Sequence, residues 1–329
     1  MSGRVDDNLM MLRVNPDPDP DVSVVISTRN HGRYVGDTLE AVAAQEGVSL
    51  ELIVVDDAST DETESIARAF AARTDIPFTY VLVPAHGGQA LGRNRGVELA
   101  KGEFIAFTDA DCVPNPRWLD RALASFERCP SFGMVQGRTE CRQRHPAMFT
   151  HFIQTRRFDS SFSTSNIVYR RTAIGRHRFD PSCIYWEDTD LGFRVRSDGW
   201  DVGFARDALV HHQVVPQSVR TWLMWPRRYV NWPAKVARYP DFRRTLFLKT
   251  WVRPLHACFD LAVGGVVAMK FGHRRLALVL CIPYAVGFAS TRGMGGRAPW
   301  MKVGLHAARD VVAFVSLLAG SIRYRRVVL

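Results

Sequence analysis

The sequence predicts an α/β fold with a largely parallel sheet, and two observations support this prediction. Apolar runs of strand length alternate with segments of helical pattern over residues 22–128. Two of the runs end in carboxylates: LELIVVDD ends in Asp56-Asp57, and GEFIAFTDAD ends in Asp109 and Asp111. Because parallel α/β sheets bind ligands at the carboxyl ends of their strands, these acids are expected at a binding site.

The expected elements follow one another in a regular order. The run VSVVIST (22–28) predicts a first strand, and a helix is expected from about Tyr34 to Gln45. The segment from Ser59 to Glu62 has the pattern of a capping box and predicts a helix that continues to about Arg73. The remaining expected elements, in order, are the strand FTYVLV, the glycine-opened helix GGQALGRNRGVELAKG, the strand GEFIAFTD, the helix PNPRWLDRALASFERC, mixed short strands and loops over 131–186, a helix that begins at WEDTDL, and a strand that ends in His211-His212.

The charge of the chain is concentrated in its C-terminal part. The 329 residues carry a formal net charge of +10. Residues 245–329 contain 12 Lys or Arg and only two acids, Asp260 and Asp310, so the preceding residues are neutral as a group. This basic part is also the most apolar, which favours an anionic membrane surface over nucleic acid as its partner. No nucleic-acid-binding motif accompanies the charge.

The N-terminal segment and the cysteines point to a cytoplasmic protein. Residues 1–20 contain the run PDPDPD and are expected to be disordered, and no signal-peptide pattern precedes the first strand. The six cysteines are scattered without the spacing of a zinc site or a disulfide framework. Reduced, mostly buried thiols are therefore expected.

The C-terminal part divides into two further regions. Residues 216–254 combine tryptophans with Arg and Lys, which is typical of helices at a membrane interface and nearly as typical of a packed subdomain. Residues 255–329 contain two apolar stretches, 255–271 and 276–290, each shorter than the ~20 residues that cross a bilayer. A tilted hairpin, a re-entrant pair and buried core helices remain open, and Asp260 and Pro283 count against a simple span. From Val311 an apolar stripe at helical spacing predicts an amphipathic helix, on a membrane or on the protein.

A family resemblance rests on five segments in a fixed order. VSVVISTRN, VVDDASTDET, GRNRGVELAKGEFIAFTDAD, SNIVYRR and WEDTDLGFRVRSDGW together resemble the family 2 inverting glycosyltransferases of the GT-A fold. The resemblance covers about residues 22–212. It implies a GT-A catalytic domain over 21–215, a nucleotide-sugar donor, a divalent metal ion and a single displacement at the anomeric carbon.

The first acidic pair is interpreted as part of the nucleotide site. A carboxylate at a strand end accepts hydrogen bonds from a base N–H or a ribose hydroxyl. By resemblance, Asp57 meets a uracil-type base, Ser27 borders the nucleotide, and Asp56 is either a nucleotide contact or a turn residue. Arg93 is expected to reach the diphosphate, although an exposed cation fits this position as well.

The second acidic pair predicts a metal site. Asp109 and Asp111 lie two residues apart in an extended segment and point to the same side, so their oxygens can hold Mg²⁺ or Mn²⁺. By resemblance, Asp111 binds the metal directly and Asp109 contacts ribose or the metal through water. His211 or His212 is a candidate third ligand, and strand alternation allows only one of them to face the site.

The third acidic pair, Glu187-Asp188, is interpreted as the site of the catalytic base. An inverting displacement needs a base that takes the proton of the attacking hydroxyl, and by resemblance that base is Asp188, with Glu187 orienting it or the acceptor. Acids also occur in a first helical turn for purely electrostatic reasons. Trp186 and Asn166 are expected on the acceptor side, although Thr164 or Ser165 replaces the glycine that usually precedes the asparagine motif.

These inferences combine into one predicted activity with named rivals. The chain is expected to transfer a sugar from a nucleotide-sugar, most simply a UDP-sugar, to a hydroxyl of a lipid-linked or cell-envelope saccharide at the cytoplasmic face of the membrane. A polyprenyl-phosphate sugar synthase is the rival within the class, and a catalytically inactive nucleotide-sugar-binding module lies outside it. A nucleotide-binding dehydrogenase is disfavoured because STRNHG stands where a GxGxxG segment would follow the first strand.

Overall fold

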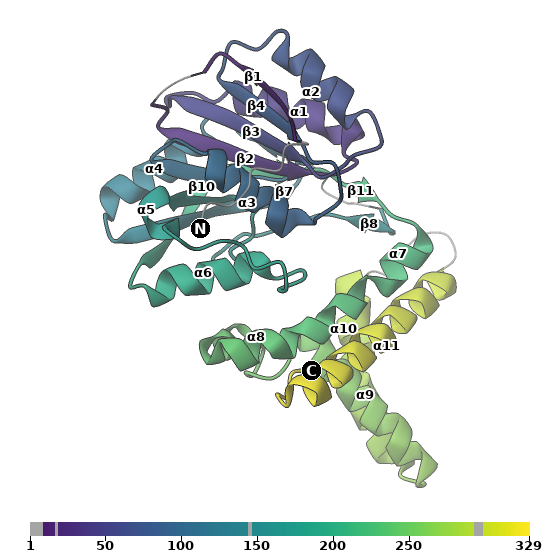
Figure 1. Ribbon diagram of the computed structural model, residues 1–329. Helices are drawn as coiled ribbons and strands as arrows, with labels where there is room; N and C mark the ends of the chain where they lie inside the picture. The colour runs from purple at the N-terminus through teal and green to yellow at the C-terminus, as the bar shows by residue number, and fades with distance from the viewer. Residues whose placement is uncertain (1–8, 17–18, 144–146, 293–298) are drawn as a thin grey trace. The chain divides into compact units, whose positions relative to one another are not determined.

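The computed structural model describes residues 9–16, 19–143, 147–292 and 299–329, and Figure 1 shows the arrangement of its elements. The chain divides into two compact units, with the boundary between Pro216 and Gln217. The strands of the first unit are β1 (Met10–Val14), β2 (Val22–Thr28), β3 (Leu50–Asp56), β4 (Phe78–Leu82), β5 (Phe104–Phe107), β6 (Cys112–Pro114), β7 (Phe132–Cys141), β8 (Thr150–His151), β9 (Ile167–Arg170), β10 (Asp201–His212) and β11 (Val215–Pro216). Its helices are α1 (Gly32–Ala43), α2 (Thr63–Ala71), α3 (Gln89–Leu99), α4 (Trp118–Arg128), α5 (Arg171–Ile174) and α6 (Glu187–Ser197).

Nine of these strands form one mixed sheet in the order β1-β4-β3-β2-β5-β9-β7-β10-β6. The strands β4, β3, β2 and β5 are parallel, which confirms the α/β prediction. Strand β9 is antiparallel to both β5 and β7, and β6 is antiparallel to β10. The carboxyl ends of β3 and β5 and the end of β10 therefore supply the residues of the candidate site.

Helices cover both faces of the sheet because its strands are apolar on both sides. Helices α1, α2 and α4 bury their apolar faces in one core cluster with side chains such as Val24, Leu52 and Tyr80. Helix α3 packs on the opposite face, where Gly92 lies against Ser27 and Gly96 against Val25. A Cβ at either glycine would fall 2.2 Å from the facing side chain, so these two glycines let α3 approach β2 closely.

Two local expectations about this unit are wrong. Residues Met10–Val14 are not disordered but form β1, which adds antiparallel to β4, because the segment MMLRV alternates its side chains along a free sheet edge. Helix α2 begins at Thr63 rather than at the Ser59–Glu62 segment. The carboxylate of Asp61 accepts from the Thr63 backbone N–H at 3.0 Å, while the Ser59 hydroxyl accepts from the Asn30 backbone.

The second unit is helical. Its elements are α7 (Val219–Met224), the 3₁₀ segments η1 (Trp225–Asn231) and η2 (Pro240–Thr245), α8 (Trp232–Arg238), α9 (Pro254–Lys270), α10 (Arg274–Arg292) and α11 (Pro299–Tyr324). Helices α9 and α10 form a tight hairpin in which Gly265 lies against the backbone of Ala277 and the side chain of Cys281. Helix α11 packs on η1, α8 and α7 (Figure 1).

Candidate active site

The two aspartates at the end of β3 face different partners. Asp56 is fully buried, and its carboxylate accepts from the Ser59 backbone N–H at 2.8 Å and from the Tyr80 hydroxyl at 2.7 Å. Burial raises the pKa of Tyr80 well above its usual range, and the hydrogen bond to Asp56 raises it further. Asp56 therefore joins the turn after β3 to strand β4. This is the turn role, one of the two roles expected for this residue.

Asp57 instead faces the loop that opens α3. Its two carboxylate oxygens accept from the backbone N–H groups of Gly87 at 2.7 Å and Gly88 at 2.9 Å, and Oδ2 lies 2.5 Å from Nδ1 of His86. Gly88 has a φ of 92°, a backbone conformation that is unfavourable for any residue with a side chain. The sequence interpretation missed this His-Gly-Gly contact, although a glycine pair between a strand and a helix is a recognisable signal.

Arg93 connects two of the three acidic pairs. Its guanidinium is 5% exposed, donates to Oε1 of Glu187 at 2.7 Å and lies 3.3 Å from Oδ1 of Asp109. Burial alone would lower the pKa of Arg93, but the carboxylates of Asp109, Glu187 and Asp188 raise it above its usual value. The arginine is therefore a fixed cation between the loop after β5 and the start of α6. The exposed-cation alternative for this residue is wrong, because its side chain is buried beside Asp109, Glu187 and the Phe179 ring.

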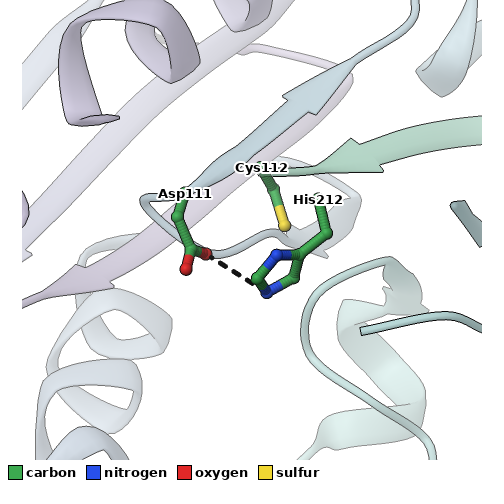
Figure 2. Close-up of side chains that lie close together, drawn as sticks. All are labelled: Asp111, Cys112 and His212. Carbon is green, nitrogen blue, oxygen red and sulfur yellow. Dashed lines mark ion pairs between the residues drawn. The ribbon is translucent and has the colours of Figure 1, made fainter. Parts of the chain in front are cut away.

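Asp111, Cys112 and His212 form a buried cluster beside that loop (Figure 2). One potential ligand atom from each lies within 4.8 Å of the others, and Asp111 Oδ1 is 3.5 Å from His212 Nε2. His212 Nδ1 is 2.6 Å from the Gln213 carbonyl oxygen and donates to it, which leaves Nε2 as the ring nitrogen that faces Asp111. Burial raises the pKa of Asp111, and the nearby His212 opposes that rise.

The donor set of this cluster fits a divalent cation of the hard or borderline type. A carboxylate oxygen and an imidazole nitrogen suit Mg²⁺ or Mn²⁺. Burial raises the pKa of Cys112 well above its usual value. Its soft sulfur suits neither Mg²⁺ nor Mn²⁺, which prefer oxygen and nitrogen ligands. Asp111 and His212 are the residues that would hold the metal.

The two adjacent histidines lie on opposite sides of β10. His212 pairs in register with Cys112 on β6 and Cys141 on β7, whereas His211 pairs with Val113 and Glu140. Because alternate residues of a strand point to opposite faces, only His212 shares a side with Asp111. Burial lowers the pKa of His211, and its Nδ1 has no hydrogen-bond partner within the described residues.

The third acidic pair lies in the first turn of α6. Glu187 is buried against Arg93, and Asp188 is half-buried, with Oδ1 accepting from the Thr189 backbone N–H at 2.6 Å. Trp186 is the buried residue that precedes the helix. Through Arg93, Glu187 is linked to Asp109, so the start of α6 and the loop after β5 belong to one site.

Two other predicted residues are held inside the protein. Asn166 is buried, and its side chain donates to the carbonyls of Arg138 and Ala208 at 2.9 Å while accepting from Trp118 Nε1 at 2.8 Å. The full set of partners gives Asn166 a structural role that joins β9 to its neighbours. Ser27 faces Gly92 of α3 and is half-buried. An acceptor contact for Asn166 and a nucleotide contact for Ser27 stay predictions.

Comparison with known proteins identifies the family. The model of the family described as "Glycosyl transferase family 2" matches residues 23–180. The model described as "Glycosyl transferase family group 2" matches residues 104–290. A putative teichuronic acid biosynthesis glycosyltransferase, TuaG of Bacillus subtilis, is 36% identical over 237 residues, which are 70% of this chain and 92% of TuaG. The chain belongs to glycosyl transferase family 2. It is therefore a glycosyltransferase, as the resemblance of the five segments implied.

Other relatives of this family 2 protein match over a smaller share of their length. Glycosyltransferase AglE of Haloferax volcanii is 34% identical over 59% of this chain and 67% of its own length. The uncharacterized glycosyltransferase YibD of Escherichia coli is 37% identical, but the match spans only 27% of this chain and 26% of YibD.

Solved structures support the GT-A fold for this family 2 chain. The mannosyltransferase PcManGT of Pyrobaculum calidifontis, in complex with GDP-Man and Mn²⁺, aligns with a TM-score of 0.58 at 20% identity and covers 95% of this chain and 89% of its own. S. aureus TarS 1-349 in complex with UDP-GlcNAc aligns with a TM-score of 0.54 at 17% identity, covering 93% and 92%. At these identities the likeness shows the fold alone.

Proposed function

We propose that this chain transfers a sugar from a nucleotide-sugar, most simply a UDP-sugar, to a hydroxyl of a lipid-linked or cell-envelope saccharide, with inversion at the anomeric carbon. The observation that carries the proposal is the bridge made by buried Arg93 between Asp109 and Glu187. It brings the end of β5, where the donor would sit, to the start of α6, where the base would sit. A transfer reaction needs these two functions within one site.

In this proposal the donor is held from three sides. Asp111 and His212 would hold Mg²⁺ or Mn²⁺, which as a Lewis acid stabilises charge on the departing nucleoside diphosphate. Arg93 adds a buried positive charge beside the same diphosphate, and Asp109 contacts ribose or the metal through water. Asp57 binds the nucleobase with carboxylate lone pairs that the Gly87 and Gly88 N–H groups leave free.

Asp188 is the proposed base of the displacement. Its carboxylate would take the proton of the acceptor hydroxyl as the oxygen attacks the anomeric carbon and the nucleoside diphosphate leaves. Glu187 cannot share that task freely, because its carboxylate is buried against the Arg93 guanidinium. Glu187 is therefore assigned to positioning Arg93 and the start of α6.

The choice of donor and acceptor draws on the relatives. TuaG is named for teichuronic acid biosynthesis and ExoO of Rhizobium meliloti for succinoglycan biosynthesis, which favours an envelope or extracellular polysaccharide as product. The aligned structures hold UDP-GlcNAc and GDP-Man with Mn²⁺, so UDP- and GDP-sugars both belong in the test.

The test is metal-dependent donor turnover across a panel of UDP- and GDP-sugars, with and without a membrane extract as the source of acceptor. We expect Mn²⁺ or Mg²⁺ to support turnover and EDTA to abolish it. Calorimetry with UDP and Mn²⁺ measures binding independently of turnover. An inactive nucleotide-sugar-binding module would bind UDP and show no turnover. Absence of any metal-dependent nucleotide binding would refute the proposal.

The Asp188→Asn variant distinguishes the proposed activity from that of a polyprenyl-phosphate sugar synthase. A phosphate acceptor is already ionised and needs no strong base, so full turnover by this variant with a polyprenyl phosphate would favour the rival. We expect instead a loss of roughly 10²- to 10⁴-fold in kcat, the usual contribution of a general base. Asp198→Asn, which changes a half-exposed acid at the other end of α6, is the matched control.

We further propose that the second unit attaches the chain to the cytoplasmic face of a membrane. Within the described residues, one helical segment, Trp300–Tyr324, is long and apolar enough to cross a bilayer. The α9–α10 hairpin exposes Val266, Leu278 and Val279 at 55%, 65% and 63%, and its tip carries Arg274 and Arg275. An exposed apolar surface beside cations suits an anionic lipid surface.

The membrane proposal is tested by flotation of the purified chain with vesicles. We expect co-flotation with phosphatidylglycerol-containing vesicles and weaker flotation with neutral phosphatidylcholine vesicles. A full-length chain that stays soluble without detergent and ignores both vesicle types would refute it.

A further inference from the structure

A cavity of about 550 Å³ lies at the end of β10, where His211 is part of its lining. It is lined by Val113, Glu140, Cys141, Arg142, Gln143, Gln154, Arg156 and His211. Val113, Glu140 and His211 stand in register on three adjacent strands, so they share one face of this part of the sheet. Its volume is within the range of small-molecule sites, and none of its residues has a role in the proposed chemistry.

The cavity lining carries more positive than negative charge. The Glu140 carboxylate is already paired with Arg138, at 3.4 Å from its Nη1. Arg142 has an acidic neighbour only at 4.0 Å, Asp37, and the Arg142 side chain is 59% exposed. Arg156 lies 3.1 and 3.3 Å from the side-chain amide of Gln154, whose oxygen accepts from it. The Arg142 guanidinium is thus available for a ligand, and Arg156 keeps Nη1 for one, since its Nε and Nη2 meet Gln154.

The polar groups around these arginines are also suited to an oxyanion. Gln143 and Gln154 supply amide N–H donors, and His211 supplies a ring whose Nδ1 has no partner within the described residues. Guanidinium groups bind phosphates and carboxylates with two parallel hydrogen bonds, which makes paired arginines selective for these groups. Among the described lining residues the only acid is Glu140, and its pairing with Arg138 offsets its charge.

We propose that this cavity binds an anionic group, a phosphate or a carboxylate, carried by the acceptor saccharide. This inference rests on the proposed function and narrows its acceptor to an acidic glycan or a phosphate-linked one. Arg142 and Arg156 bind the oxyanion, and the glutamine side chains fix its orientation.

The cavity is coupled to the metal cluster through two short links. His211 and His212 are consecutive, so their Cα atoms are ~3.8 Å apart. The Arg142 backbone N–H also donates to the His212 carbonyl at 3.1 Å. An acceptor anchored by its charge in the cavity would therefore lie beside the strand end that holds the metal ligand.

The direct test is a titration of the full-length chain with inorganic phosphate, followed by NMR of its histidine ring signals. Saturating UDP and Mg²⁺ keep phosphate out of the donor site, and Mg²⁺ avoids paramagnetic broadening. His211→Gln assigns the His211 signal among the 10 histidines. We expect a saturable shift of the His211 signal, with affinity reduced about tenfold by Arg142→Gln and by Arg156→Gln, since each removes one charge-assisted interaction.

Arg157→Gln is the matched control, because Arg157 is exposed, follows Arg156 directly and does not line the cavity. Equal weakening by all three variants, or no saturable shift, would overturn the proposal. The same variants should keep metal-dependent UDP binding, so failure of the donor site is distinguished from failure of the cavity. If UDP does not bind but phosphate shifts His211, the proposed function fails and the anion site stands alone.

Two further arms distinguish the source of the anion. A soluble acidic oligosaccharide should compete with phosphate for the His211 shift and should act as an acceptor whose KM rises about tenfold in Arg142→Gln. Vesicles that contain phosphatidylglycerol should float with wild type and Arg142→Gln equally if the anion belongs to a saccharide. A selective loss of flotation by Arg142→Gln and Arg156→Gln, without change in acceptor KM, would assign the cavity to a lipid headgroup and overturn the acceptor assignment.

Discussion

Helices α4 and α10 are both rich in apolar residues, yet only α4 buries its apolar side chains. Trp118, Leu119 and Phe126 of α4 are at most 1% exposed because they pack in the core beneath the sheet. On α10, Leu278, Val279 and Ile282 are 65%, 63% and 56% exposed. Helix α4 thus packs its apolar side chains inside the first unit, and α10 leaves much of its apolar surface exposed in the second. Changes in the first unit should therefore affect chemistry and stability, and changes in the second should affect location.

The largest effect is expected from Asp111→Asn in the first unit. The substitution removes the buried carboxylate that would bind the metal, so kcat for transfer should fall by roughly 10³-fold or more. Vesicle flotation should stay unchanged. Steady-state kinetics with Mn²⁺ measure the loss, and Asp201→Asn, an exposed acid at the start of β10, is the control. A variant that keeps wild-type kcat would show that the metal binds elsewhere.

A smaller effect is expected from the two histidines, and it differs between them. His212→Gln should weaken Mn²⁺ binding about 10- to 100-fold, because Nε2 of His212 faces Asp111. His211→Gln should change Mn²⁺ affinity by less than about threefold, since His211 lies on the other side of β10. Calorimetry with Mn²⁺ and UDP compares the two. The reverse order would contradict the strand register described for β10.

The neighbouring aspartates Asp56 and Asp57 should separate stability from binding. Asp56→Ala leaves the Ser59 N–H and the Tyr80 hydroxyl without their buried acceptor, so the free energy of unfolding should fall by about 2 kcal/mol. Asp57→Ala should weaken UDP binding in addition to stability, because Asp57 also accepts from the Gly87 and Gly88 N–H groups. Urea unfolding and UDP calorimetry on both variants measure this difference. A large loss of UDP affinity in a stable Asp56→Ala variant would reverse the two roles.

The smallest effect is expected from Leu278→Glu in the second unit. A charge on the exposed face of α10 should lower vesicle partitioning about tenfold, because it opposes burial of that face in lipid. Transfer to a soluble acceptor should be unaffected. Flotation with phosphatidylglycerol vesicles measures the change, with Leu278→Ala as a control that keeps the surface apolar. Unfolding of the second unit, visible by circular dichroism, would show that the face is structural instead.

Some elements of the fold and the site could be predicted from the sequence alone. The strands β3 and β5, which lead to Asp57 and Asp111, the helix that begins at Glu187 and the family itself followed from apolar runs and ordered motifs. Those patterns reflect local backbone geometry and burial. The edge strand β1 and the start of α2 were missed. Both depend on partners distant in the sequence: β4 for the first, and the Asn30 backbone, which occupies Ser59, for the second.

The chain's residue order was enough to determine that it is a family 2 glycosyltransferase with acids at the carboxyl ends of its strands. Only the tertiary structure determined which partner each of these side chains contacts. His212 rather than His211 faces Asp111, Asp56 rather than Asp57 anchors Tyr80, and Arg93 is buried between Asp109 and Glu187. Adjacent residues of a strand differ only in the face to which they point, and strand pairing determines what lies on each face.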